Sequence, residues 1–218
     1  MKATLPGPDK RIAVIGSTGS GKTFAGVFHL SVADFHIRPW IIFDFKGDAL
    51  IGDIGATELD IRNAPPKSPG VYVVRPIPGE DDLIEAFLWK VWANENTGIY
   101  IDEGYMMPAK RGGAFIACLT QGRSKYIQMI VLSQRPSWMT RFVFSEADFF
   151  QIFRLNDKRD YEIIQSMISV DIKKRVDRFY SHYYDVGEDM GYIFGPVPNR
   201  AKLIETFKLR LKKSPRVL

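Results

Sequence analysis

The chain has 218 residues, 45% hydrophobic and 25% charged, which suits one globular domain over 1–218 with a sizeable core. No apolar run approaches the ~18 residues of a membrane span, and the first ten residues lack the apolar stretch of a secretory signal. The single cysteine, Cys118, excludes an internal disulfide and a cysteine-based metal cluster, and we expect it to be a small buried hydrophobe. These features are consistent with a reducing, cytoplasmic setting.

The net charge is +5, and it is distributed unevenly. Residues 104–145 contain six basic residues and no acidic one. The C-terminal segment 200–218 contains seven basic residues against Glu205, so the rest of the chain is acidic. Such segregation is typical of a protein that meets a polyanion on one face, although two solvated basic surfaces give the same pattern.

Two predicted elements flank a glycine-rich segment near the start of the chain. The apolar run at 11–15 predicts a buried strand, and 23–31 predicts a helix. Between them the chain fulfils the pattern G-x-x-x-x-G-K-[ST] of a phosphate-binding loop, or P-loop. The residues expected to bind ATP are Gly16, Ser17, Thr18, Gly19, Ser20, Gly21, Lys22 and Thr23.

Each residue type in this loop suits a bound triphosphate. Gly16 and Gly21 let the backbone turn tightly, so that successive N–H groups point at phosphate oxygens. Lys22 places a positive charge near the β- and γ-phosphates, and the Thr23 hydroxyl is a suitable ligand for Mg²⁺. The N-terminus of the following helix adds its dipole to anion binding. ATP and Mg²⁺ are therefore the expected cofactors.

The remaining pattern alternates strands with helices. Strands are predicted at 40–45, 71–75, 98–103, 127–134 and 149–155. Helices are predicted at 81–95, 114–125, 158–168 and 171–184. Segment 46–70 is expected to be mostly loop, and 191–195 and 203–209 a closing pair of strands. The alternation predicts an α/β fold with a mostly parallel sheet flanked by helices, which binds ligands at the carboxyl ends of its strands.

An acidic pair follows the predicted strand at 98–103. Apolar residues followed by Asp at the end of a strand form the Walker B pattern, here ending in Asp102 and Glu103. Asp102 is expected to hold the Mg²⁺ shell, directly or through water. Glu103 is expected to polarise the attacking water as general base. Adjacent acids also occur at solvated strand ends, and it is the P-loop upstream that gives this pair its interpretation.

The next strand ends in Ser-Gln-Arg-Pro, where Gln134 is placed to contact both water and the γ-phosphate. Arg123 precedes that strand, at the end of a predicted helix. An arginine there is expected to project into the site of a neighbouring subunit, where an arginine finger stabilises transition-state charge. A surface cation at a helix C-terminus explains Arg123 equally well. Arg135 and Arg141 are the competing candidates for the finger.

These motifs, in this order, resemble those of the FtsK–HerA superfamily of DNA-pumping ATPases. They are Gly16–Thr23, Phe43–Asp48, Tyr100–Glu103, Gln121–Arg123 and Ser133–Pro136. With its short length, the chain is most similar to genome-packaging ATPases of tailless icosahedral viruses with an internal membrane, a resemblance that covers 10–155. It implies a RecA-like core, a ring that is usually a hexamer, an active site completed by a neighbour's arginine, and DNA in a central channel.

The chain departs from this family in the second motif, where Phe45 replaces a frequent proline. In that motif Asp44, Lys46 and Asp48 either support the site or form a plain turn. Lys110 and Arg111, followed by two glycines, are candidates for a loop that contacts DNA phosphates. Exposed aromatic residues would add stacking contacts, but such residues more often pack a core or a subunit interface. These are Tyr105, Trp138 and Phe142.

The expected function is ATP-driven movement of double-stranded DNA into a viral capsid. Expected partners are duplex DNA, further copies of the chain and capsid portal or vertex proteins, in the host cytoplasm or at the packaging vertex. One alternative is a plasmid-borne or cellular translocase of the conjugation type. Another is an ATP-regulated assembly protein that hydrolyses little, and a third is a small-molecule kinase. The Asp102–Glu103 pair favours water as the acceptor, which argues against the kinase.

Overall fold

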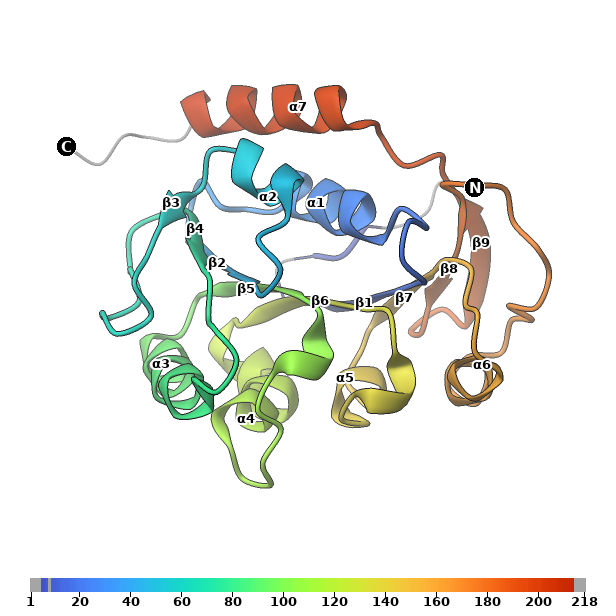
Figure 1. The fold of residues 1–218 in the computed structure, drawn as a ribbon, viewed down its shortest axis with the longest axis horizontal. Coiled ribbons are helices and arrows are strands. Elements are labelled where there is room, and N and C mark those ends of the chain that lie inside the picture. Colours follow the sequence, from blue (N-terminus) through green and yellow to red (C-terminus); the bar gives the residue numbers. More distant parts are fainter. Residues whose placement is uncertain (1–4, 8, 214–218) are drawn as a thin grey trace.

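The computed structural model describes residues 5–7 and 9–213, and these form one α/β domain built on a nine-stranded sheet (Figure 1). The strands are β1 (Arg11–Ile15), β2 (Pro39–Asp44), β3 (Thr57–Glu58), β4 (Gly70–Val74), β5 (Gly98–Asp102), β6 (Gln128–Ser133), β7 (Phe149–Ile152), β8 (Ser181–Asp185) and β9 (Met190–Phe194). Their spatial order is β3-β4-β2-β5-β6-β1-β7-β8-β9. All neighbours are parallel as far as β7, and β8 and β9 add an antiparallel pair.

Helices cover both faces of this sheet. They are α1 (Lys22–Val32), α2 (Ala49–Asp53), α3 (Asp81–Asn94), α4 (Ala114–Gln121), α5 (Phe142–Ser145), α6 (Lys158–Gln165) and α7 (Arg200–Lys213), with 3₁₀ turns η1 (Gly104–Met106), η2 (Gly122–Lys125) and η3 (Pro136–Trp138). In Figure 1, α1, α2 and α7 lie above the sheet, and α3 to α6 lie below it. None of the helices in the described ranges has the length and apolar character to cross a membrane.

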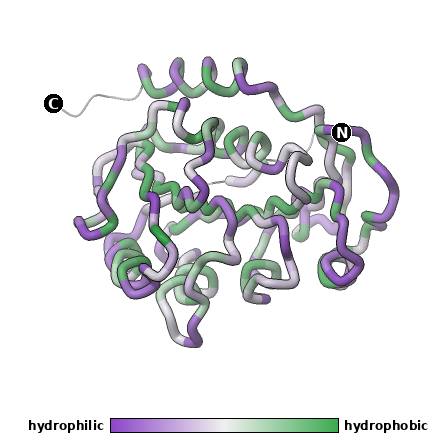
Figure 2. Tube along the Cα trace, viewed as in Figure 1, coloured by the Kyte–Doolittle hydropathy of each residue, from purple (hydrophilic) through white to green (hydrophobic). Residues whose placement is uncertain are grey.

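The way in which the core packs on both faces of the sheet explains why the central strands are easy to predict from the sequence. Ala13 and Ile15 of β1 pack into the cluster between the sheet and α3 to α6, while Ile12 and Val14 pack into the cluster between the sheet and α1 and α7. Every residue of β1 is therefore buried, and the strand is a continuous apolar run rather than an alternating one. Figure 2 shows the hydrophobic residues gathered along the central strands.

The parallel register brings the functional motifs to one edge of the sheet. Ile15 pairs with Ser133 at the ends of β1 and β6, and Asp44 pairs with Asp102 at the ends of β2 and β5. The P-loop, the acidic pair and the end of β6 therefore meet at the carboxyl edge, as predicted. The expected α/β architecture, with a mostly parallel sheet flanked by helices, is confirmed.

Two expected elements in the last third are wrong. The expected helix at 171–184 is instead an irregular segment followed by β8, because β8 pairs with β7 and buries all its residues. The expected strand at 203–209 lies inside α7, where Leu203 and Phe207 are one helical turn apart and both buried. The strand that pairs with β9 is β8 rather than 203–209.

Smaller differences concern boundaries. Segment 46–70 is mostly loop, as expected, but contains α2 and the two-residue strand β3. The helix expected at 114–125 ends at Gln121 and continues as the 3₁₀ turn η2. Helix ends of this kind depend on local hydrogen bonds that spacing does not reveal.

The basic segment 200–218 is described as far as residue 213, where it forms α7 over α1 and α2. The Phe207 ring stacks on Phe35, with the ring centroids 5.6 Å apart. Arg210 donates hydrogen bonds to the carbonyl oxygens of Ser31 and Ala33 at the end of α1, the latter at 2.8 Å. Part of this positive charge therefore fixes the helix in place, because a cation there satisfies free carbonyls and complements the helix dipole.

Candidate nucleotide-binding and hydrolysis site

The P-loop joins β1 to α1 and is held by both neighbouring strands. The Gly16 N–H donates to Ser133 O at 3.1 Å, and the Ser17 N–H donates to Arg154 O at 2.9 Å. Gly19 and Gly21 adopt φ angles of 75° and 105°, which favour glycine. The loop is thus anchored between the ends of β6 and β7, with the N-terminus of α1 directly after it.

Gln134 lies where the sequence predicts it, at the tip of β6 beside the P-loop. Its Oε1 accepts a hydrogen bond from the Thr18 hydroxyl at 2.6 Å. The residue after the β6 strand therefore contacts the phosphate-binding loop directly.

Glu103 is the most enclosed acidic group of the site. Its side chain is fully buried, and its backbone has a φ of 70°, in the left-handed region. Lys22 Nζ donates to Glu103 Oε1 at 3.1 Å, and Lys46 Nζ contacts the same oxygen. The other oxygen, Oε2, is buried and has no hydrogen-bond partner among the described residues. A buried carboxylate with one unused oxygen is expected at a site that accepts a proton or a water.

Asp102 supplies the second carboxylate, at the end of β5. It is 1% exposed, and its Oδ1 has no hydrogen-bond partner among the described residues. Burial raises the pKa of Asp102 to about 6, a shift that Lys22 opposes and Glu103 adds to. A cation bound here would stabilise the ionised form.

These residues fit the Mg²⁺ site of a P-loop protein. Within the described ranges, no three His, Cys, Asp or Glu side chains are grouped to hold a metal ion. A P-loop site needs no such group, because one hydroxyl and one carboxylate share the ion with phosphate oxygens and water. Thr23, in the first turn of α1, and the unused Oδ1 of Asp102 meet that requirement.

The motif after β2 is partly structural. Asp44 Oδ1 accepts the Asp48 N–H at 3.0 Å, and Asp48 Oδ1 caps α2 through the Leu50 N–H at 2.8 Å. Arg75 Nε donates to Asp44 Oδ2 at 3.1 Å. The two aspartates therefore build the turn, and Lys46 is the member of this motif that reaches Glu103.

A cavity beside the P-loop was not predicted from the sequence. It has a volume of about 460 Å³ and extends from the P-loop to the irregular segment 171–180. The lining residues outside the P-loop are Arg154, Asn156, Arg175, Val176, Asp177, Arg178 and Tyr180. Three arginines here suit the negative charge of a nucleotide. The basic residues at 173–178 were a sequence signal for this cavity, but the segment was interpreted as a helix.

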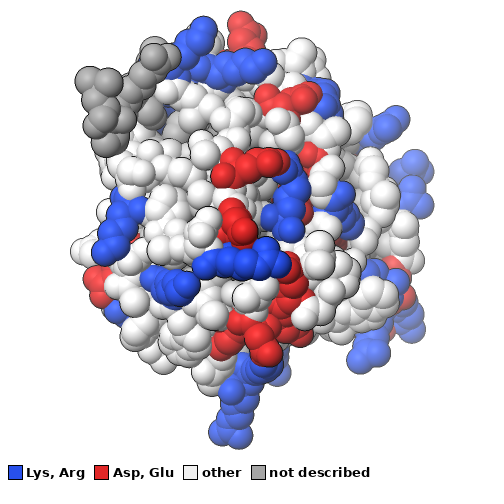
Figure 3. All heavy atoms as spheres, turned by 60° about the vertical axis from the view of Figure 1, so that its left-hand side comes forward, with Lys and Arg blue, Asp and Glu red and all other residues white. Residues whose placement is uncertain are grey.

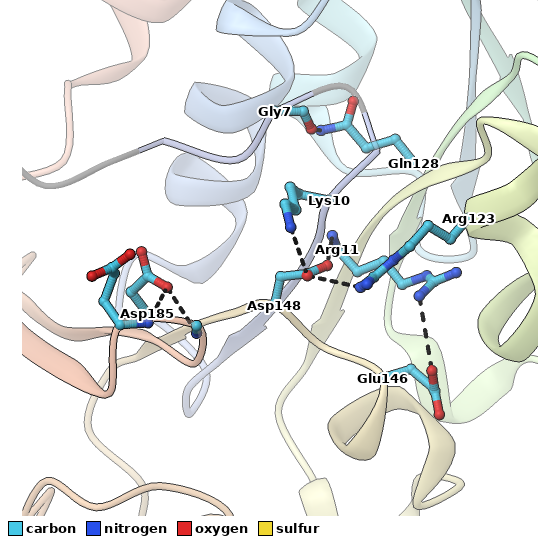
Figure 4. Close-up of polar contacts among 10 residues, drawn as sticks. Gly7, Lys10, Arg11, Arg123, Gln128, Glu146, Asp148 and Asp185 are labelled. Carbon is cyan, nitrogen blue, oxygen red and sulfur yellow. Dashed lines mark hydrogen bonds and ion pairs between the residues drawn. The ribbon is translucent and has the colours of Figure 1, made fainter.

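Arg123 does not belong to the site of its own chain. It lies in η2 at the amino edge of the sheet, where its Nη2 donates to Asp148 Oδ1 at 2.8 Å (Figure 4). Asp148 also accepts the N–H of Arg11 at the start of β1, whereas the P-loop follows the end of that strand. Five residues of β1, roughly 16 Å, separate the two edges. Arg123 therefore lies at the opposite edge of the sheet from the P-loop of its own chain.

The other candidate arginines differ in their surroundings. Arg135 lies 3.2 Å from both Asp157 and Asp160 and stacks over Trp138. Arg141 is exposed and forms no ion pair within the described part of the chain. Arg135 is thus already neutralised at the carboxyl edge, beside its own P-loop.

The acid-free stretch 104–145 is not free of acids in space. Acidic residues from other segments pair with Lys110, Arg123, Lys125 and Arg135. On the face drawn in Figure 3, basic and acidic side chains alternate rather than forming one basic patch. The charge segregation seen along the sequence is therefore reduced by folding.

The fold and the site together define a P-loop ATPase with a Walker B carboxylate pair and a polar side chain at the tip of the adjoining strand. No model of a known protein family matches the chain. The chain is 46% identical to the DNA packaging ATPase P9 of Enterobacteria phage PRD1, over 98% of each sequence. It belongs to the same family of DNA packaging ATPases.

Solved structures support the fold independently. The genome packaging NTPase B204 of Sulfolobus turreted icosahedral virus 2, in complex with AMPPCP, aligns with a TM-score of 0.74 at 20% identity, covering 88% of this chain and all of B204. The conjugation coupling protein TcpA of pCW3 aligns with a TM-score of 0.59 at 15% identity, covering 93% of this chain and 66% of TcpA. At these identities the likeness concerns the fold.

Proposed function

We propose that this protein is the ATP-driven motor that moves double-stranded DNA into a viral capsid. The observation that carries the proposal is that the P-loop contacts both other parts of the site, Gln134 through Thr18 and Glu103 through Lys22. The full-length similarity to a DNA packaging ATPase supports the choice of DNA as the cargo. The likeness to TcpA rests on fold and does not favour a conjugation-type translocase.

The geometry supports a direct route for hydrolysis. Lys22 leaves Glu103 and binds the β- and γ-phosphates when ATP enters the P-loop. Oε2 of Glu103 then takes the proton of a water whose oxygen attacks the γ-phosphorus, while the bond to the bridging oxygen of ADP breaks. Gln134, joined to Thr18, senses whether the γ-phosphate is present. Thr23 and Asp102 are the residues that would hold Mg²⁺, which would supply positive charge next to the phosphates.

The site is completed by a second subunit. Arg123 is 52% exposed at the amino edge of the sheet, and this exposure supports a role in which it enters the site of the next copy in a head-to-tail ring. A hexamer is the ring size that the family resemblance implies. Arg135 is held by two carboxylates and serves less well, whereas exposed Arg141 remains the alternative finger.

DNA is contacted by loops that line the central channel of the ring. Arg111 is exposed and has no ion-pair partner in the described ranges, and Lys110 pairs only with Asp82, which is itself 96% exposed. Such cations bind phosphates without regard to sequence. The motor acts in the host cytoplasm and docks on capsid portal or vertex proteins at the packaging vertex.

The proposal is tested by ATPase rates with and without duplex DNA, together with mass measurement in solution. We expect DNA to raise the rate, a ring to form, and the motor to displace a third strand from a triplex only when ATP is present. Lys22→Ala is the matched control without hydrolysis. A monomer whose ATPase rate does not change when DNA is added would favour the alternative of an ATP-regulated assembly protein.

A further inference from the structure

Lys46 reaches the catalytic centre from an element that carries no other part of the hydrolysis machinery. It lies in the turn between β2 and α2, and its Nζ contacts Oε1 of Glu103. The same oxygen accepts a hydrogen bond from Lys22 at 3.1 Å. The two lysines differ in surroundings, because the Lys46 side chain is 42% exposed and that of Lys22 is 7% exposed. Two cations therefore share one oxygen of a fully buried carboxylate, and we expect ATP binding to change this arrangement.

ATP binding removes one of these partners. The P-loop lysine is needed by the phosphates, so Lys22 has to leave Glu103. A fully buried carboxylate without a partner is strongly unfavourable. Of the charged groups that face this pocket, Asp44 is held by Arg75 and Asp48 caps α2, while Asp102 is a like charge. Lys46 is the cation that remains for Glu103.

We propose that Lys46 is a positioning residue that holds Oε1 of Glu103 while Lys22 moves to the phosphates. The inference rests on the proposed role of Glu103 as general base. With Oε1 fixed by Lys46, the free Oε2 is the oxygen that faces the attacking water and takes its proton. Lys46 itself transfers no proton and touches no phosphate. Its effect is to keep the base in one orientation through the step in which the site exchanges cations.

The turn that carries Lys46 does not depend on its side chain. The hydrogen bonds from Asp48 N to Asp44 and from Leu50 N to Asp48 fix the turn. Phe45, beside it, packs against the core. Replacing a side chain that is 42% exposed therefore leaves the fold intact. Lys46→Met keeps the length of the side chain and removes its charge.

The matched control is Lys158→Met, which removes an exposed lysine from an ion pair on α6, outside the site. We expect Lys46→Met to lower kcat roughly 10²-fold while the Kd for ATP stays within about threefold and Tm is unchanged. Lys158→Met should leave all three values as they are in the original protein. Lys46→Arg should restore part of kcat, because a guanidinium can hold the same oxygen.

Three outcomes would overturn the proposal. The first is a normal kcat in Lys46→Met. The second is a selective loss of affinity for ATP relative to ADP, which would place Lys46 on the γ-phosphate. The third is an additional loss when Lys46→Met is combined with Glu103→Gln, because a residue that acts only through Glu103 adds nothing once the carboxylate is absent. If Glu103→Gln by itself keeps full turnover, it is the role of Glu103 that fails, and Lys46 is then left without its target.

Discussion

Two carboxylates at opposite edges of the sheet each bind cationic side chains, but they differ in whether one carboxylate oxygen is left without a hydrogen bond. Asp148, at the amino edge, accepts from Lys10 and Arg123 on Oδ1 and from the Arg11 N–H on Oδ2 (Figure 4). Glu103, at the carboxyl edge, has both its lysines on Oε1 and nothing on Oε2. A carboxylate with both oxygens satisfied organises structure, and one with a buried free oxygen is ready for a substrate.

The largest effect on the ATPase rate is expected from a change of Arg123. This residue lies at the amino edge of one subunit and is proposed to act at the carboxyl edge of the next. Arg123→Ala should lower the ATPase rate of the ring by roughly 10³-fold or more, because an arginine finger carries that much transition-state stabilisation. Lys22→Ala subunits keep Arg123 and lose their own site. Mixing the two variants therefore rebuilds complete sites at about one interface in four.

The mixed-subunit rate is measured against each variant by itself, with subunit exchange followed by mass. Recovery of activity confirms that Arg123 acts in trans. No recovery in a mixture that has exchanged subunits means that Arg123 serves Asp148 and the fold of its own chain. The same mixture made with Arg141→Ala tests the competing arginine.

Sequence reasoning succeeded where a short motif dictates its own geometry. The P-loop and the Asp102–Glu103 pair were located because β1 and β5 are buried on both faces and read as continuous apolar runs. The place of Gln134 at the tip of the strand beside the acidic pair was also predicted, whereas its hydrogen bond with Thr18 was not.

The last third of the chain resisted the same reasoning. In 171–184, apolar residues fall at helical spacing, but pairing with β7 makes its last residues a strand. In α7, Leu203 and Phe207 fit either period, and packing against Phe35 decides for the helix. The cavity lined by Arg154 and Arg178 joins segments distant in sequence, so the basic run at 173–178 does not reveal it without the fold.

The next effect in size concerns Glu103. Glu103→Gln keeps the shape of the side chain and removes its basicity, so kcat should fall roughly 10²- to 10⁴-fold. ATP binding should persist, because the P-loop and Lys22 are unchanged. The measurement is single-turnover hydrolysis beside equilibrium binding of a labelled ATP analogue. Undiminished turnover would show that Glu103 is not the general base and that, like Asp148, it has a structural role.

Asp148→Asn should act on stability rather than on nucleotide chemistry. The substitution weakens the hydrogen bonds to two cations and a backbone N–H at a side chain that is only 13% exposed. We expect a loss of about 1–3 kcal/mol in the free energy of unfolding, with ATP affinity unchanged. Urea denaturation measures the first and ligand titration the second. A variant with normal stability and weakened ATP binding would contradict the assignment of Asp148 to structure.

The smallest effect is expected from Lys10, which is the weakest partner of Asp148. Its side chain is 38% exposed and its Nζ lies 3.3 Å from Oδ1, so solvent screens the ion pair. Lys10→Met should cost about 0.2–1 kcal/mol of unfolding free energy, and less in high salt. Arg123 and the Arg11 N–H still satisfy Asp148 in this variant. If Lys10→Met is instead as damaging as Asp148→Asn, the stability of the amino edge depends on its cations rather than on the carboxylate that collects them.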